Sequence, residues 1–339
     1  MGSINISRQT TVDLLTEFVG FKAGIILTDV ELSELLQDYD AVFSKKIVSE
    51  EIGGFRFHSS EVDEIAAHIL YKLGNIDEPT TIPHHLRLYH QVKSDPNKLA
   101  CYEHVMGCYS EFMRSILSDP PPYGTALDPE PFMRAAMTGH GKDGLDMAME
   151  VIRGVNHQLH ISPNGQIRSH DWKDTVELKS LFKSESLETM YGSFFDQRFI
   201  DYLQRNFDKI GEIHWRKFEG IAGEFFEREG FRVDMGPGRN DDGIDLRIYP
   251  REEVEDVPPL IIVQCKRQKE KIGKTLLKSV YADVLHEKSG SGLIVTSSYM
   301  SPGAETMRVA RGYPVRTADR DTLKTWIAKM KSERIWRCS

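Results

Sequence analysis

The stretch from residue 236 to residue 268 constrains the fold of this chain more than any other. It carries a turn rich in Gly and Asp, the acid Asp245, an apolar run at 246–249 and, after a polar spacer, a second apolar run that ends in Gln264-Cys265-Lys266. Side chains alternate between the two faces of a strand, so Gln264 and Lys266 are predicted to lie on the same face. An acid, an amide and an ammonium group at the edge of a hairpin make a poor hydrophobic core. They suit a site that holds a divalent cation and a water molecule beside a phosphate group.

The segments around this stretch predict an α/β domain. An amphipathic helix at 215–229 precedes it, with Phe218, Ile221 and Phe225 on one side. Short apolar segments then alternate with helical ones, which is the order of an opening hairpin followed by β-α-β units. That order predicts a mixed sheet with helices on both faces. The predicted strands are 231–235, 244–249, 260–266, 292–296 and 314–317, and the predicted helices that follow the hairpin are 274–287, 303–311 and 321–330.

Residues 1–205 differ from the rest because their apolar residues mostly follow helical spacing. We therefore predict a mainly α-helical N-terminal domain at 1–205, ahead of the α/β domain at 206–339. Its expected role is regulation, target recognition or oligomerisation. Cys101, His104 and Cys108 would share one face of a helix. We interpret them as core residues rather than a zinc site, because their spacing matches no standard zinc pattern and cysteine is often buried.

Charge is distributed unevenly along the chain. The net charge is −8, but residues 212–339 contain 23 Lys and Arg against 20 Asp and Glu, whereas residues 1–211 contain 20 against 31. This asymmetry fits a domain that handles nucleic acid beside a partner domain that does not, although uneven surface charge also arises by chance. No apolar run approaches the roughly 18 residues of a membrane helix, and no secretory leader is recognisable. The four cysteines form no disulfide framework, so we expect a cytoplasmic protein.

Six short motifs occur in a fixed order in the second part of the chain. Together they closely resemble the catalytic domain of Mrr-like restriction endonucleases, members of the PD-(D/E)xK nuclease superfamily, over about residues 212–330. The resemblance implies an endonuclease that cuts DNA with Mg²⁺, or with Mn²⁺ as a substitute, and that acts as a restriction or anti-phage effector. The motifs are Phe218-Glu219, Gly230-Phe-Arg-Val233, Asp242-Gly-Ile-Asp245-Leu, Val263-Gln-Cys-Lys266-Arg, Gly292-Leu-Ile-Val-Thr296 and Ser301-Pro-Gly-Ala304.

The resemblance assigns site roles to the residues of the opening stretch. Asp245 is the expected carboxylate ligand of Mg²⁺, and the backbone carbonyl of Cys265 is a second ligand. Lys266 is expected to orient or deprotonate the attacking water and to offset the negative charge that develops on the phosphate. Gln264 stands where many relatives outside the Mrr group carry Glu or Asp. It offers an oxygen ligand without charge, so we expect weaker metal binding but not a dead site.

A further acid is expected from the helix at 215–229. Advancing 100° per residue from Phe218 places Glu219 at the edge of the apolar stripe, whereas Glu224 and Glu227 fall on the solvent side. We therefore predict that Glu219 is a catalytic residue and a metal ligand, which is also the position that the family uses.

Basic residues flank the predicted site and are expected to contact the phosphates of DNA. Because cutting both strands needs two sites, we expect a homodimer or a larger homo-oligomer. Another defence protein, or a signal, is an expected partner of the N-terminal domain, and a membrane is not. Two alternatives stay open, a structure-specific nuclease of the Holliday-junction type and a DNA-binding module without cleavage, and the residues do not distinguish DNA from RNA. The predicted DNA contacts are Arg239, Arg267, Lys269, Lys271 and Lys274.

Overall fold

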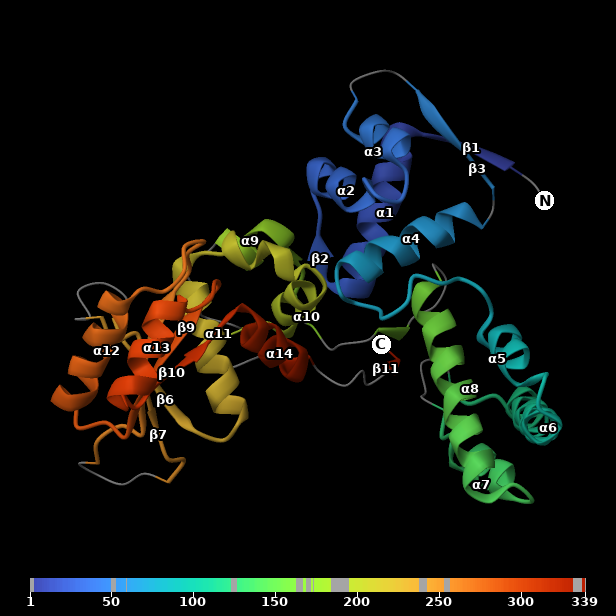
Figure 1. Ribbon diagram of the computed structural model, residues 1–339. Helices are drawn as coiled ribbons and strands as arrows, with labels where there is room; N and C mark the ends of the chain where they lie inside the picture. Colours follow the sequence, from blue (N-terminus) through green and yellow to red (C-terminus); the bar gives the residue numbers. More distant parts are fainter. Residues whose placement is uncertain are drawn as a thin grey trace. The chain divides into compact units, whose positions relative to one another are not determined.

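The computed structural model (Figure 1) describes residues 3–49, 53–58, 60–122, 127–162, 167–168, 172, 174–183, 195–237, 243–252, 257–331 and 337–338. The chain forms two compact units, Met1–Thr175 with Arg334–Ser339, and Val176–Glu333. The short helices α9 (Leu178–Lys183) and α10 (Gln197–Arg205) belong to the second unit. The functional border predicted at 205/206 stays a prediction. None of the helices in these ranges combines the length and hydrophobicity that crossing a lipid bilayer requires.

The first unit is mainly helical. Its strands β1 and β3 pair in antiparallel fashion, as do β4 and β11. Cys101 lies in a buried hydrophobic cluster with Val105 and Phe132, and Cys108 packs against that cluster, which is the place of core residues. The helices are α1 (Arg8–Ala23), α2 (Asp29–Leu36), α3 (Ala41–Ile47), α4 (Glu61–Lys72), α5 (His84–Val92), α6 (Pro96–Ser118), α7 (Glu130–Met137) and α8 (Gly141–Ile161). The strands are β1 (Ser3–Ser7), β2 (Ile25–Ile26), β3 (Gly54–His58), β4 (Ile167–Arg168) and β11 (Arg337–Cys338).

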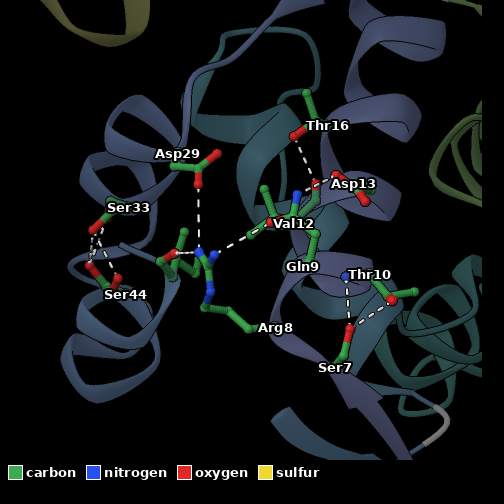
Figure 2. A network of polar contacts seen from close by, with 11 residues as sticks. Ser7, Arg8, Gln9, Thr10, Val12, Asp13, Thr16, Asp29, Ser33 and Ser44 are labelled. Atoms are coloured by element: carbon green, nitrogen blue, oxygen red, sulfur yellow. Dashed lines mark hydrogen bonds and ion pairs between the residues drawn. The ribbon is translucent and has the colours of Figure 1, made fainter. Parts of the chain in front are cut away.

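Polar side chains organise the start of α1 (Figure 2). Ser7 caps the helix, and its hydroxyl accepts a hydrogen bond from the Thr10 N–H at 3.1 Å. Arg8 donates through Nη1 to the Ile47 carbonyl oxygen at 2.6 Å and lies 3.6 Å from the Asp29 carboxylate. Because Ile47 ends α3 and Asp29 begins α2, this one side chain joins three helices of the first unit.

The second unit contains a five-stranded sheet in the order β10-β9-β8-β7-β6. Strands β6, β7 and β8 are antiparallel neighbours, and β8, β9 and β10 are parallel. The predicted α/β class and mixed sheet are confirmed. The strands are β6 (Arg232–Met235), β7 (Leu246–Tyr249), β8 (Ile261–Lys266), β9 (Ser291–Thr296) and β10 (Val315–Ala318), with β5 (Val176–Glu177) outside this sheet. The remaining helices are η1 (Phe207–Gly211), α11 (Trp215–Arg228), α12 (Lys274–His286), α13 (Pro302–Arg311) and α14 (Arg320–Met330).

Helices pack on both sides of this sheet (Figure 1). On one side α11 and α14 meet, and the rings of Phe225 and Trp326 stack with their centroids 4.1 Å apart. On the other side α12 approaches β9 closely at Gly292. A Cβ atom there would lie 2.7 Å from Val280 Cγ1 and 2.9 Å from Val284 Cγ2, so only glycine allows this helix so near the sheet.

An ion pair fastens α12 to the sheet and predicts a pH dependence of stability. Arg247 on β7 donates to both carboxylate oxygens of Glu287, at 3.0 and 2.8 Å. These hydrogen bonds lower the pKa of Glu287 below its ordinary 4.5. The stability gained from a lowered pKa is present above about pH 4.5 and is lost as the pH falls through the folded-state pKa. We expect Glu287→Gln to lower Tm by about 2 °C near neutral pH, and the difference from the wild type to vanish in acid.

Thermal unfolding followed by circular dichroism from about pH 7 to about pH 3 measures this difference. Glu270→Gln is the matched control, because Glu270 is exposed and its side chain makes no hydrogen bond or ion pair with the described residues. A Tm difference for Glu287→Gln that persists unchanged in acid would show that charge pairing is not the cause.

Candidate active site

Asp245 sits immediately before β7 and is held by its own backbone. Its N–H donates to the Val263 carbonyl oxygen at 2.9 Å, and its carbonyl oxygen accepts the Gly236 N–H at 2.8 Å. Its side-chain Oδ2 accepts the Cys265 N–H at 2.6 Å. The residue is only 7% exposed. These bonds fix the carboxylate against the last residues of β8, and continuing the register of β7 and β8 by one residue places Asp245 opposite Gln264.

Gln264 lies on β8 with its amide buried. Its Oε1 is an oxygen with no solvent contact and no hydrogen-bond partner among the described residues. Leaving such a buried acceptor without a donor costs about 1–3 kcal/mol. The unpaired oxygen of Gln264 therefore needs an explanation. Gly243 makes room for it: a Cβ at Gly243 would lie 2.8 Å from Gln264 Nε2, and its φ of +89° also favours glycine.

Lys266 ends β8 two residues after Gln264, on the same face of the strand. Its backbone oxygen accepts a hydrogen bond from Thr296 Oγ1 at 2.9 Å, which fastens the strand end to β9. Its side chain is partly exposed, and Nζ has no hydrogen bond or ion pair within the described part of the chain. The ammonium group is therefore available to a ligand at this edge of the sheet.

Glu219 brings a second carboxylate from α11. It is 6% exposed, and Arg216 Nη1 donates to its Oε2 at 2.8 Å. Burial raises the pKa of the Cys265 thiol well above its usual value, Asp245 and Glu219 raise it further by their charges, and Lys266 lowers it. The thiol thus stays protonated near neutral pH. Asp245 contacts the end of β8 directly through the Cys265 N–H, and the charges of Glu219 and Lys266 also act on the Cys265 thiol.

The prediction that Glu224 faces solvent was wrong. Glu224 is 3% exposed, accepts the Arg228 Nε–H at 2.7 Å and accepts the Phe195 N–H at 3.2 Å. A helical wheel considers one face of one helix, whereas here the segment before α10 covers a second face of α11. Glu227 remains partly exposed. Glu224 is thus bonded to structural partners, and the site role of Glu219 stays a prediction.

The donor atoms at this site fit a hard divalent cation. Two buried carboxylates, an amide oxygen without a partner and the backbone carbonyl of Cys265 would supply oxygen ligands, which Mg²⁺ prefers. The described residues contain no group of three or more His, Cys, Asp or Glu side chains spaced for a metal. A cation at this site would therefore need the amide and carbonyl oxygens as well as the two acids.

The predicted DNA contacts occupy different environments. Lys269 and Lys271 are exposed and line a pocket of about 670 Å³ beside the end of β8. Arg267 lines the same pocket, but its Nη1 donates to the Gly211 carbonyl oxygen at 2.8 Å. Lys274 begins α12 outside the pocket lining, and Arg239 lies outside the described residues. Sequence reasoning missed Arg320, which also lines the pocket; nothing in the sequence near Arg320 indicates a site.

The match to a known family follows the same region of the chain. Residues 210–327 match the family model Mrr_cat, described as a restriction endonuclease. The resemblance predicted from the six motifs is thereby confirmed, and the C-terminal part is a restriction-endonuclease-type domain.

Individual relatives are distant. The chain is 22% identical over 120 residues to the uncharacterized protein y4cE of Sinorhizobium fredii, an alignment that covers 35% of this chain and 31% of the relative. Among solved structures, the MspJI restriction endonuclease in complex with a 27-mer oligonucleotide aligns at 19% identity with a TM-score of 0.27, covering 61% of this chain and 43% of that chain. The chain spans less than half the length of both proteins.

Proposed function

We propose that this protein is a Mg²⁺-dependent endonuclease that hydrolyses phosphodiester bonds in DNA, with Mn²⁺ as a substitute metal. One observation carries the proposal. Asp245 is buried opposite Gln264, whose amide oxygen has no partner among the described residues, and Lys266 ends the same strand with an ammonium group that is unpaired among them. Glu219 is a second buried carboxylate, and its charge acts on the neighbouring Cys265. This set offers what phosphodiester hydrolysis needs, namely oxygen ligands for a cation and a positive group for the reacting phosphate.

Each residue has a distinct part in the proposed reaction. A bound magnesium ion would supply Lewis acidity toward a phosphate oxygen and lower the pKa of the attacking water. Asp245 and Glu219 would hold it, with Gln264 Oε1 and the Cys265 carbonyl completing the oxygen set. Lys266 would donate a hydrogen bond to the phosphate oxygen on which negative charge grows. The water oxygen would form a new bond to phosphorus as the bond from phosphorus to the oxygen of the leaving strand breaks. The water would lose a proton to the solvent and the leaving oxygen would take one up, while the protonated Cys265 thiol takes no part.

The biological setting is also part of the proposal. We propose that the chain acts in the cytoplasm as a restriction or anti-phage effector. In that setting residues 1–205 would recognise the target, sense a signal or a partner defence protein, or build a homodimer or larger assembly that cuts both strands. The restriction-endonuclease-type domain supports this proposal. Size-exclusion chromatography with light scattering, with and without DNA, tests the oligomeric part.

A cleavage assay tests the reaction and separates the alternatives. Plasmid, methylated DNA, branched DNA and RNA would be incubated with Mg²⁺, with Mn²⁺ and with EDTA. Cutting of plasmid or methylated DNA that EDTA abolishes supports the proposal, whereas cutting restricted to branched DNA indicates a junction-specific nuclease. DNA binding that persists in EDTA, with no cleavage in either metal, would indicate a binding module and overturn the proposed activity.

The uncharged ligand at position 264 leads to a prediction about metal affinity. Gln264→Glu should lower the Mg²⁺ concentration for half-maximal cleavage by about tenfold, because a carboxylate adds a charge to the oxygen set. The same change should lower Tm in EDTA, since a second carboxylate then lies opposite the buried Asp245 with no metal ion to balance the two charges. Metal titrations of the cleavage rate, together with thermal unfolding in EDTA, measure both effects.

The control is Gln37→Glu, which adds the same charge at an exposed position on the first unit. It should change neither the Mg²⁺ requirement of cleavage nor the Tm difference between EDTA and Mg²⁺. An unchanged Mg²⁺ requirement in Gln264→Glu would remove Gln264 from the ligand set.

A further inference from the structure

The pocket beside the end of β8 has walls of unequal character. Its volume is about 670 Å³, and all of its lining belongs to the second unit. The loop after β8 forms one wall, the residues after β9 and the start of α14 form another, and η1 closes a third side. Arg267 follows Lys266 directly in the chain, so the pocket begins one residue from the candidate active site.

The serines that line the pocket serve the protein itself. Ser297 Oγ donates to the Gln268 carbonyl oxygen at 2.9 Å and accepts the Gln268 N–H at 3.0 Å. Ser298 Oγ donates to the Lys269 carbonyl oxygen at 3.0 Å. Both serines are nearly buried, with 8% and 6% exposure. They brace the loop after β8 against the loop after β9 and therefore hold the wall in shape without needing a ligand.

Three of the four basic residues that line the pocket have no such partners within the described chain. Lys269, Lys271 and Arg320 make no side-chain hydrogen bond or ion pair with any residue that the structure describes. Arg320 is nevertheless held in place. Its guanidinium carbon lies 5.0 Å from the centre of the Phe207 ring, and its backbone N–H donates to the Ser298 carbonyl oxygen at 3.0 Å. A guanidinium group that is positioned by stacking keeps its N–H edges free for a planar pair of oxygens.

The pocket lining contains four basic residues and two acidic ones. Asp208 and Glu212 line the η1 side, where Arg320 stacks on Phe207 and Arg267 donates to Gly211, whereas Lys269 and Lys271 line the side of the β8 loop. Arg267 is less available than the others, since one of its nitrogens already donates to the Gly211 carbonyl oxygen. An anion entering this pocket would therefore meet Arg320, Lys269 and Lys271 first.

We infer that the pocket binds a phosphate of the DNA strand next to the phosphate that is cut, with Arg320 as its principal contact. The inference rests on the proposed function and refines it, because it separates this anchoring site from the catalytic group at Asp245 and Lys266. The guanidinium group of Arg320 donates hydrogen bonds to two oxygens of this phosphate, while Lys269 and Lys271 contribute positive charge. Anchoring the neighbouring phosphate would set the register of the strand relative to Lys266.

DNA binding in EDTA tests the inference apart from cleavage. The anisotropy of a short fluorescein-labelled duplex would be measured with wild type, Arg320→Ala and Arg320→Lys over a range of KCl concentrations. We expect Arg320→Ala to bind about tenfold more weakly and to lose about one unit from the slope of log K against log salt, because one phosphate contact is removed. Arg320→Lys should recover part of the affinity, since it keeps the charge but not the fork.

Arg316→Ala is the matched control, because Arg316 is an exposed arginine on β10 outside the pocket, with no side-chain partner among the described residues. It should reduce affinity by less than about twofold and leave the salt slope unchanged. If Arg320→Ala and Arg316→Ala bind the DNA duplex with the same affinity, the inference is overturned. A wild type that does not bind DNA would also overturn it.

Two further outcomes separate this inference from the proposed function. If the wild type cleaves DNA and Arg320→Ala binds DNA as tightly as the wild type, the proposed nuclease activity stands and the anchoring site is ruled out. If the wild type does not cleave DNA and Arg320→Ala weakens DNA binding, the phosphate-binding role of Arg320 stands and the proposed nuclease activity is ruled out. Inorganic phosphate that raises Tm only when Arg320 is present, with no Arg320 effect on DNA binding, would identify a site for a free anion instead.

Discussion

Replacing Asp245 by Asn should lower the cleavage rate by about 100-fold or more at saturating DNA. The substitution removes one of the two buried charges proposed to hold the cation, but the amide oxygen of Asn can still accept the Cys265 N–H that Asp245 Oδ2 accepts at 2.6 Å. The loss should therefore arise at the metal and not from a change of fold. Cleavage rates on plasmid DNA, and isothermal titration with Mg²⁺, measure the two consequences together.

Circular dichroism and Tm establish that the Asp245→Asn variant is folded. Weak metal binding and slow cleavage are expected to appear together in this variant, and raising the Mg²⁺ or Mn²⁺ concentration should recover part of the rate. If the Asp245→Asn variant cleaves DNA at the wild-type rate at ordinary Mg²⁺ concentrations, the proposed mechanism is wrong.

Replacing Lys266 by Ala should also lower the cleavage rate by about 100-fold, but with Mg²⁺ binding retained or strengthened. The reason is that Lys266 is proposed to stabilise charge on the reacting phosphate and not to hold the metal. Its Nζ has no partner within the described residues, so removing it should leave Tm almost unchanged. Single-turnover cleavage rates and the same Mg²⁺ titration distinguish this variant from Asp245→Asn.

Lys278→Ala is the matched control, since Lys278 is an exposed residue of α12 outside the site and the pocket. It removes the same charge and should keep the wild-type rate to within about twofold, because only long-range attraction of DNA is affected. A Lys266→Ala variant as active as Lys278→Ala would show that the ammonium group has no catalytic part.

The order of the elements from α11 to α14 could be predicted almost completely, whereas β5, α9 and α10 were expected to belong to the N-terminal domain. Apolar periodicity and turn residues are local signals, and strands β6 to β10 begin and end within about two residues of the predicted ranges. The sequence also predicted the arrangement of Asp245, Gln264 and Lys266, because alternation along β8 puts Gln264 and Lys266 on the same face of the strand. Glu219 could be located by helical geometry, since it borders the apolar stripe of α11.

Glu224 shows where local geometry stops being informative. A helical wheel indicates which residues share a side of α11 but not how many sides other segments cover. The Phe195 N–H reaches Glu224 from a segment 29 residues earlier in the chain, and Arg228 completes the pair. No periodicity in the sequence of α11 encodes that contact, so the acid appeared to be exposed when it is buried.

The sequence by itself determined the local elements from α11 to α14, their α/β order and which residues share a strand face at the end of β8, because strand alternation and helical spacing act over a few residues. Only the tertiary structure decided which charges are free to act. It tied Arg267 to the Gly211 carbonyl oxygen, left Lys266, Lys269 and Lys271 without side-chain partners among the described residues, and brought Arg320 from the start of α14 onto the ring of Phe207. The physical reason is that a charge becomes available or committed through the packing of segments distant in sequence, which no short-range pattern records.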